Sequence, residues 1–437
     1  MISELSLKIV FIVHYFPPIN SSGAKRIEAI SKYLADAGHQ VTVITTRKSS
    51  ADGDFTEITP RGVEMIELDW LGRDSSSKGD SGRFEPMYNG KASLKRRVKD
   101  VVMEIFGQLP DPRLLFAFAF ASPWLARRVR TALSSANVVI GSTPPWPMLL
   151  AAMIAKWRFG IPCILDYRDH FSECHEMPGG PFAKWLEKRI DQQLVKHADA
   201  VVAISPPMAK YYASMRNDVH CILNGFDHEV LDAARLRSRR IDSNGRIVIR
   251  YMGIVSPGRV PHNLMLALLR LKNENPELLA RISLEFYGNA VLIAQAISEK
   301  YSGLQDSFSY HESVSYGESL RLIVEADFLL FSETSSMSSI SAQGILTTKL
   351  FEYIGSGRPI LADIAGDTLA GSVLIKTGCG HIVGNSVEVF LTALLHEKFL
   401  ERRPDNICDE VMRFSRRSQA LEYEKIIDVI ASKGFLK

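Results

Sequence analysis

The chain has 437 residues, of which 46% are hydrophobic and 23% are charged, and its formal net charge is +3. This balance excludes an intrinsically disordered chain, and a charge so close to zero argues against a nucleic-acid partner. One hydrophobic core rarely organises a chain of this length, so we expect two domains.

The N-terminal part begins with a strand, a helix and a second strand. Residues 8–13 predict the first strand, residues 23–38 an amphipathic helix closed by glycine, and residues 39–45 the next strand. Such a βαβ unit implies a parallel sheet. Its turn lacks the glycine fingerprint of dinucleotide-binding folds, so no dinucleotide cofactor is expected here.

Further strands follow, each ending in polar residues, after a polar segment at 72–92 that predicts a loop. Polar residues just past the carboxyl ends of parallel strands line the ligand crevice in such sheets. The residues that this rule places at one edge are His14, Ser142, Asp169, His170, Ser205 and Asn224.

An apolar stretch at residues 114–126, LLFAFAFASPWLA, is shorter than the ~20 residues that a membrane-spanning helix needs. Basic clusters at 95–99 and 127–130 flank it, so it is either core or a surface that touches anionic lipid.

The five cysteines show no metal-binding spacing and are expected to be reduced thiols. We expect a cytoplasmic protein, with peripheral contact at the inner face of the membrane as an open alternative.

A linker is predicted around residues 231–244, where the chain becomes arginine-rich before a fresh strand begins at Arg246. The N-terminal domain is therefore predicted at 1–230 and the C-terminal domain at 246–405. A helical segment at 406–437 is expected to pack back across the domains. The predicted fold class is α/β, with two Rossmann-like doubly wound domains.

One helix in the second domain carries a lysine and a glutamate three residues apart. Thr347 or Thr348 is its expected N-cap, and glycines 355–357 end it before a buried strand. Lys349 and Glu352 share one face of this helix. They form either a solvated ion pair or part of a binding site.

Four stretches together resemble glycosyltransferase family 4, whose members are retaining enzymes of the GT-B fold. They are residues 14–45, 165–171 (LDYRDHF), 222–227 (ILNGFD) and 347–362 (TTKLFEYIGSGRPILA). They follow the order of the family and span nearly the whole chain. The resemblance implies an active site in the cleft between the domains. The implied function is transfer of a sugar from a nucleotide-sugar donor to a hydroxyl acceptor, with a lipid-linked acceptor as one candidate, in glycan, polysaccharide or glycoconjugate biosynthesis.

The resemblance also implies a donor site on the second domain. Glu352 would hold the ribose hydroxyls, and the diphosphate would lie over the N-terminus of the same helix, near Lys349 and Arg259. Lys349 and Arg259 would then stabilise the leaving diphosphate. The donor-binding residues so implied are Gly23, Gly253, Arg259, Leu346, Thr347, Thr348, Lys349 and Glu352.

Acceptor-side residues are implied in the first domain. They are Ser22, Asp169 and His170, and His170 is a candidate catalytic residue, with a structural histidine as the alternative. Gly23 would allow close backbone approach to a substrate, unless it is an ordinary helix-start glycine.

Two features set this chain apart from the family pattern or from metal-dependent transferases. Many members carry a glutamate eight positions before the one matching Glu352, and here that position is Gly344. Asp166 and Asp169 do not form a DxD motif, so we expect neither a metal nor a cofactor besides the donor. A sugar-nucleotide epimerase and a non-catalytic nucleotide-sugar-binding relative are the alternatives.

Overall fold

The computed structural model of the chain describes residues 6–48, 60–73, 101–174, 177–238, 246–255, 259–333, 346–382, 386–395 and 408–435. They form two compact units, which divide between Leu223 and Asn224. The basic cluster 95–99, most of the predicted polar loop and Gly344 lie outside the described residues.

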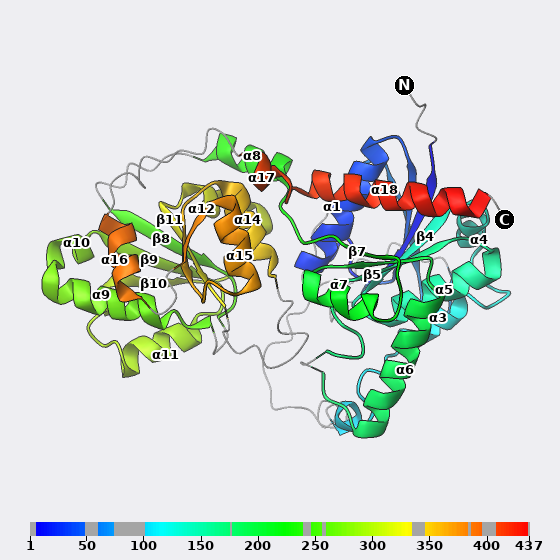
Figure 1. The fold of residues 1–437 in the computed structure, drawn as a ribbon, viewed down its shortest axis with the longest axis horizontal. Helices are drawn as coiled ribbons and strands as arrows, with labels where there is room; N and C mark the ends of the chain where they lie inside the picture. Colours follow the sequence, from blue (N-terminus) through cyan, green and yellow to red (C-terminus); the bar gives the residue numbers. More distant parts are fainter. Residues whose placement is uncertain are drawn as a thin grey trace. The chain divides into compact units, whose positions relative to one another are not determined.

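The first unit is built on a parallel sheet of seven described strands in the order β3-β2-β1-β4-β5-β6-β7 (Figure 1). The strands are β1 (Lys8–Val13), β2 (Gln40–Thr46), β3 (Val63–Leu68), β4 (Val138–Thr143), β5 (Cys163–Tyr167), β6 (Ala200–Ala203) and β7 (Val219–Cys221). The helices are α1 (Ser22–Asp36), α3 (Leu114–Ala119), α4 (Arg127–Ser134), α5 (Pro147–Phe159), α6 (Pro181–His197) and α7 (Pro206–Ala213). Residues 419–435 of the last helix, α18 (Arg416–Phe435), also belong to this unit.

Helices cover both faces of this sheet, which explains why Ile9–Val13 of β1 are all apolar and buried. Ile9 and Phe11 of β1 pack with α1 and α18 on one face. Val10 and Ile12 pack with α3 and α5 on the other face. The C-terminal residues of α18 are thus core of the first unit.

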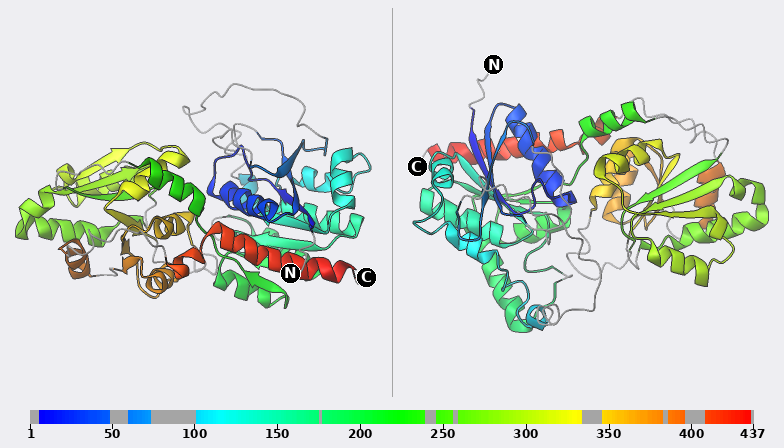
Figure 2. Two further views of the ribbon diagram at one scale, coloured as in Figure 1. Left: turned by 90° about the horizontal axis from the view of Figure 1, so that it is seen from above. Right: turned by 180° about the vertical axis from the view of Figure 1, so that it is seen from behind.

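The second unit is built on a parallel sheet of six described strands in the order β10-β9-β8-β11-β12-β13. The strands are β8 (Ile247–Met252), β9 (Ile282–Tyr287), β10 (Phe308–His311), β11 (Phe328–Ser332), β12 (Ile360–Asp363) and β13 (Gly380–Ile382). The helices are α8 (His228–Arg237), α9 (His262–Glu274), α10 (Pro276–Ala280), α11 (Val291–Glu299), η3 (Gln305–Ser307), α12 (Tyr316–Glu325), α14 (Thr348–Ser356), α15 (Leu369–Thr377), α16 (Val387–Leu395) and α17 (Asp409–Met412). Figure 2 shows this sheet from two further sides, with helices on both of its faces.

The sheet orders confirm the predicted α/β class with two Rossmann-like doubly wound domains. The predicted first strand, helix and second strand are β1, α1 and β2. Helix α8 packs against α12 and is part of the second unit, although it begins within the span predicted for the first domain. Among the described helices, none combines the length and the apolar character that crossing a membrane requires.

Candidate functional site

Helix α14 begins and ends where the sequence predicts. Thr347 is its N-cap residue, with extended backbone, and Gly357 ends it in the left-handed conformation at φ 71°. Leu350, Tyr353 and Ile354 are buried against the sheet, which fixes the rotation of the helix. Lys349 and Glu352 therefore share a different face.

Lys349 is not a solvated surface lysine. Its ammonium Nζ lies 3.7 Å from the centroid of the Tyr251 ring and 6.0 Å from that of the Phe331 ring. An ammonium over an aromatic face is stabilised by the ring quadrupole. Burial, together with the nearby Arg259 guanidinium, nevertheless lowers the pKa of Lys349 to about 7. This lysine is therefore held in a site where an added anion would stabilise its charged form.

Glu352 lies one helical turn further on and is also withdrawn from water. Burial raises its pKa to about 7, and the charge of Arg416 and a hydrogen bond from the Tyr316 hydroxyl partly offset that rise. The Arg416 side chain is 1% exposed, and its two terminal nitrogens have no hydrogen-bond partner among the described residues. The interpretation of Lys349 and Glu352 as a solvated ion pair is therefore wrong.

Arg259 and Gly253 lie in the segment that follows β8. The Arg259 guanidinium acts electrostatically on both Lys349 and Glu333, so these three side chains form one cluster. Gly253 is exposed and has φ 112°, a conformation that side chains with a Cβ rarely adopt. Its backbone N–H donates to the carbonyl of Tyr287 in β9 at 2.8 Å, which extends the pairing of β8 with β9 by one residue.

Glu333 is a member of this cluster that sequence reasoning missed. It follows β11 directly, and its carboxylate accepts a hydrogen bond from the backbone N–H of Thr347. Burial raises the pKa of this carboxyl, against the pull of Thr347, Arg259 and Lys349. The rule that polar residues past strand ends line the crevice would have found Glu333, because it ends the stretch DFLLFSE. No comparable signal in the sequence marks Tyr251, Tyr316 or Arg416.

The strand order explains why these residues meet. β8 lies between β9 and β11. The chain runs outward from β8 to β9 and β10 on one side and then continues with β11 and β12 on the other side, so the strand order reverses between β8 and β11. Ligands of doubly wound sheets bind outside the carboxyl ends of the strands at such a switch point. Gly253 and Glu333 follow the ends of these two strands, and α14 begins beside them.

The three residues at the start of α14 have unequal accessibility. Leu346 is buried, and the side-chain amide of Asn224 donates to its carbonyl at 3.4 Å. Thr347 and Thr348 are half-buried, and the Thr347 N–H is already used by Glu333. The amides inside the first turn, rather than that of Thr347, are thus the ones turned to a ligand.

In the first unit, Gly23 is next to Arg168. A Cβ at position 23 would come within 2.4 Å of Nη1 of Arg168. The guanidinium is held in place because it donates to the carbonyls of Thr143 at 3.1 Å and Pro144 at 3.0 Å. Gly23 therefore leaves room for the buried Arg168 side chain.

Asp169 and His170 follow β5, as predicted, but their environments differ. Asp169 is exposed, whereas the His170 side chain is buried, with ring centroids 5.2 Å from Tyr211 and 5.7 Å from Tyr212. His170 also interacts electrostatically with Glu173. Ser22 is the first residue of α1.

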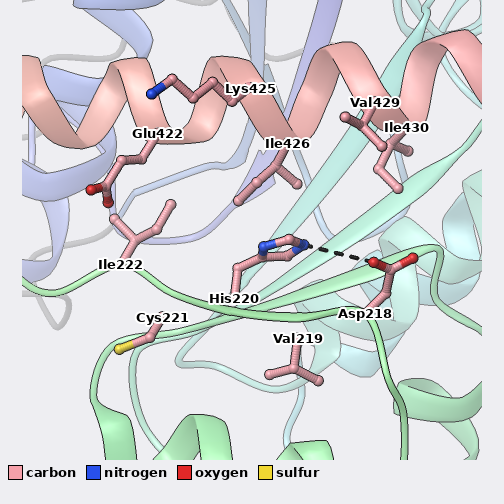
Figure 3. A pocket seen from close by; sticks show the side chains of 10 residues that line it. All are labelled: Asp218, Val219, His220, Cys221, Ile222, Glu422, Lys425, Ile426, Val429 and Ile430. Carbon is pink, nitrogen blue, oxygen red and sulfur yellow. Dashed lines mark ion pairs between the residues drawn. The ribbon is translucent and has the colours of Figure 1, made fainter.

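Two further features bear on what the described residues can bind. They contain no group of three or more histidine, cysteine, aspartate or glutamate side chains arranged to hold a metal ion. A pocket of about 550 Å³ lies in the first unit between residues 218–222 and α18 (Figure 3). None of the predicted site residues lines it.

Comparison with known proteins agrees with the fold and the motifs. Residues 23–225 match the family described as Glycosyl transferase 4-like domain. No curated protein sequence matches the chain significantly.

Solved structures of similar fold cover nearly the whole chain. Sucrose-phosphate synthase from Thermosynechococcus elongatus is 14% identical with a TM-score of 0.63, covering 97% of this chain and 99% of that one. HepE from Anabaena, in complex with UDP, is 14% identical with a TM-score of 0.61, and the match covers 97% of this chain and 100% of HepE. A structure assigned to UDP-N-acetylglucosamine 2-epimerase from Listeria monocytogenes is 12% identical with a TM-score of 0.50, covering 97% and 96%. Residues 23–225 are therefore similar to a glycosyl transferase 4-like domain, and the chain as a whole has the two-domain GT-B fold.

Proposed function

We propose that the protein is a retaining glycosyltransferase that transfers a sugar from a nucleoside diphosphate sugar to a hydroxyl acceptor in glycan, polysaccharide or glycoconjugate biosynthesis. The observation that carries the proposal is the arrangement on α14. Two cationic side chains, Lys349 and Arg259, lie at its N-terminus, and the half-buried Glu352 follows one turn later. This spacing suits a diphosphate next to a ribose.

Each part of the donor meets a group of fitting chemistry. The first-turn amides and the helix dipole of α14 favour an anion, and Lys349 and Arg259 add formal charge. Glu352 accepts hydrogen bonds from the two ribose hydroxyls, which an ionised carboxylate does with charge-assisted strength. Donor binding thereby adds to the counter-charge that Glu333 and Glu352 give Lys349 in the free protein.

The same groups serve the chemical step. When the bond between sugar and diphosphate breaks, negative charge grows on the leaving phosphate oxygens, and Arg259 and Lys349 stabilise it. In a retaining reaction the acceptor hydroxyl arrives on the face that the nucleotide leaves, so the departing diphosphate accepts its proton. We assign the acceptor side to Ser22 and exposed Asp169, and a positioning role to His170 between its two tyrosines. We propose that neither a metal nor a further cofactor takes part.

We propose UDP as the nucleotide because two neighbouring structures contain it. An epimerase and a non-catalytic binding protein are the alternatives. Incubation with UDP-sugars and candidate hydroxyl acceptors separates the three. Acceptor-dependent release of UDP supports the glycosyltransferase. Conversion of the sugar to an epimer without release of UDP supports the epimerase, and binding without either reaction supports the non-catalytic binding protein.

A binding experiment tests the phosphate site itself. In isothermal titration calorimetry, Lys349→Ala and Arg259→Ala should each weaken UDP binding about tenfold or more, while uridine binding changes little. Lys376→Ala is the matched control, because Lys376 is exposed on α15. Equal losses for UDP and uridine would show that these cations do not contact the phosphates.

For the acceptor we propose a molecule at a membrane surface, reached from the cytoplasmic side. Leu115, Phe118 and Trp124 are 56%, 55% and 84% exposed. The exposed residues Arg127 and Arg130 of α4 follow, and α4 contains no acidic residue. Aromatic residues beside cations suit the interface of an anionic bilayer.

A further inference from the structure

The carboxylate that the family pattern expects at position 344 is absent, which leaves the sugar of the donor without an evident partner in the sequence. Glu333 is a second carboxylate close to this region. It follows β11, at the switch point beside β8, and its carboxylate reaches Thr347, where α14 begins. It is thus adjacent to the site that we propose for the diphosphate.

Oε1 of Glu333 is buried and has no hydrogen-bond partner among the described residues. A buried acceptor left unpaired is energetically costly, so such a group indicates a missing ligand. An ionised carboxylate only accepts hydrogen bonds, so its partner must be a donor.

The chemistry of the donor molecule narrows the choice of partner. Phosphate oxygens carry negative charge and would be repelled by Glu333. The ribose is assigned to Glu352, one turn further along α14. The remaining hydroxyl donors belong to the transferred sugar, which is bonded directly to the diphosphate.

We propose that Glu333 binds a hydroxyl group of the transferred sugar and thereby contributes to sugar specificity. This inference rests on the proposed function, because it places the diphosphate at the N-terminus of α14. Glu333 then has a twofold role: it caps Thr347 with one side of its carboxylate and reads the sugar with Oε1. A site that hydrogen-bonds a hydroxyl discriminates strongly against analogues that lack it.

The test compares UDP with UDP-glucose, UDP-galactose and UDP-N-acetylglucosamine by isothermal titration calorimetry, using wild type and Glu333→Gln. We expect Glu333→Gln to bind UDP as tightly as wild type or more tightly, since one negative charge near the diphosphate is removed. The Kd for the sugar that wild type prefers should rise about tenfold or more relative to that for UDP. Glu285→Gln is the control, because Glu285 pairs with Arg250 at 2.7 Å within the sheet.

Deoxy analogues of the preferred sugar then identify the contact. Wild type should lose affinity for one deoxy analogue, and Glu333→Gln should not distinguish it from the parent sugar. The inference would be overturned if Glu333→Gln changed the Kd for UDP and for every UDP-sugar by the same factor. It would also be overturned if the substitution lowered the melting temperature but left the ratio of these Kd values unchanged. Glu333 would then be only a cap of α14. A wild type that binds every UDP-sugar like UDP would overturn it as well. Failure of wild type to bind UDP at all would instead refute the proposed function.

Discussion

Lys349 and Glu352 share one face of α14, and burial moves their two pKa values toward each other, both to about 7. Each residue is therefore close to losing the charge that the proposed donor binding needs. Below pH 7 the Glu352 carboxylate takes up a proton, and above pH 7 the Lys349 ammonium releases one. Because the two groups lie in one site, their titrations are coupled, and the apparent pKa values belong to the pair and not to either residue alone.

The expected consequence is a bell-shaped pH profile of kcat/KM for the donor, with its maximum near pH 7, because this ratio reports the free enzyme. Lys349→Arg should flatten the alkaline limb, since a guanidinium stays charged. Glu352→Gln should flatten the acid limb and lower the maximum about tenfold to hundredfold, because a charge-assisted hydrogen bond contributes ~1.5–3 kcal/mol. The profile is measured by initial rates of UDP release.

Lys376→Arg is the control for this series, since Lys376 is exposed and away from the cluster. An alkaline limb that persists unchanged in Lys349→Arg would assign it to a different group. The resemblance to a known family pointed to Lys349 and Glu352, but the pKa of Lys349 also depends on Glu333 and that of Glu352 on Tyr316 and Arg416, which the sequence did not connect to them.

At the scale of elements, α14 is held against the segment that enters the second unit. A Cβ on Gly355 would come within 2.3 Å of the ring of Phe226. Phe226 is itself fixed, because its backbone N–H donates to Phe414 at 3.1 Å and its carbonyl accepts from Arg416 at 2.8 Å. The motif ILNGFD therefore has a packing role here, as the surface on which the candidate donor helix rests.

Gly355→Ala should accordingly lower the free energy of unfolding by about 1–3 kcal/mol, because the added methyl group overpacks a filled site. Gly317→Ala is the matched control: Gly317 lies in the first turn of α12, where a Cβ would meet nothing within 4 Å. That control should be neutral or stabilising by up to about 1 kcal/mol. Denaturant unfolding followed by circular dichroism measures both. Equal effects of the two substitutions would show that Phe226 yields to the methyl group at little cost.

The last helix, α18, is tied into the first unit by a buried polar network as well as by apolar packing. The Tyr423 hydroxyl donates to Asp166, which also accepts from Ser142 at 2.6 Å. Arg26 lies 3.7 Å from the same carboxylate and donates to the carbonyls of Ile222 and Leu223. Asp166 in the LDYRDHF motif is therefore a structural anchor, whereas Asp169 three residues later is exposed.

At the scale of the whole molecule, the proposed membrane contact makes a measurable difference. The protein should co-sediment with phosphatidylglycerol-containing vesicles at low salt and be released at high salt, because exposed pairs of charges are screened. Arg130→Glu should lower the membrane partition constant about thirtyfold, since one basic residue near an anionic surface contributes ~1 kcal/mol and reversal of its charge counts twice. Trp124→Glu should lower it as well, because it removes an aromatic residue from the interface and adds a negative charge. Ile375→Glu is the control, as Ile375 is 66% exposed on α15 of the second unit.

If none of these substitutions changes vesicle binding, then α3 and α4 do not form the membrane contact.

The sequence predicted residues 114–126 as either core or membrane-contacting surface, and the structure divides them. Phe116 and Phe120 are fully buried, whereas Leu115, Phe118 and Trp124 are exposed. A short apolar run does not show which of its residues face outward, since that depends on the neighbours of the helix.

The sequence by itself determined the two α/β sheets, the bounds of α14 and the family resemblance, because these depend on local patterns: alternating strands and helices, glycine at a helix end and motifs in a fixed order. It also singled out Lys349, Glu352 and Arg259. Only the tertiary structure decided their surroundings. Tyr251 beneath Lys349, Arg416 beside Glu352 and Glu333 at Thr347 come from segments far apart in the chain. Burial and the field of such neighbours set a pKa, and neither can be read from spacing along the chain.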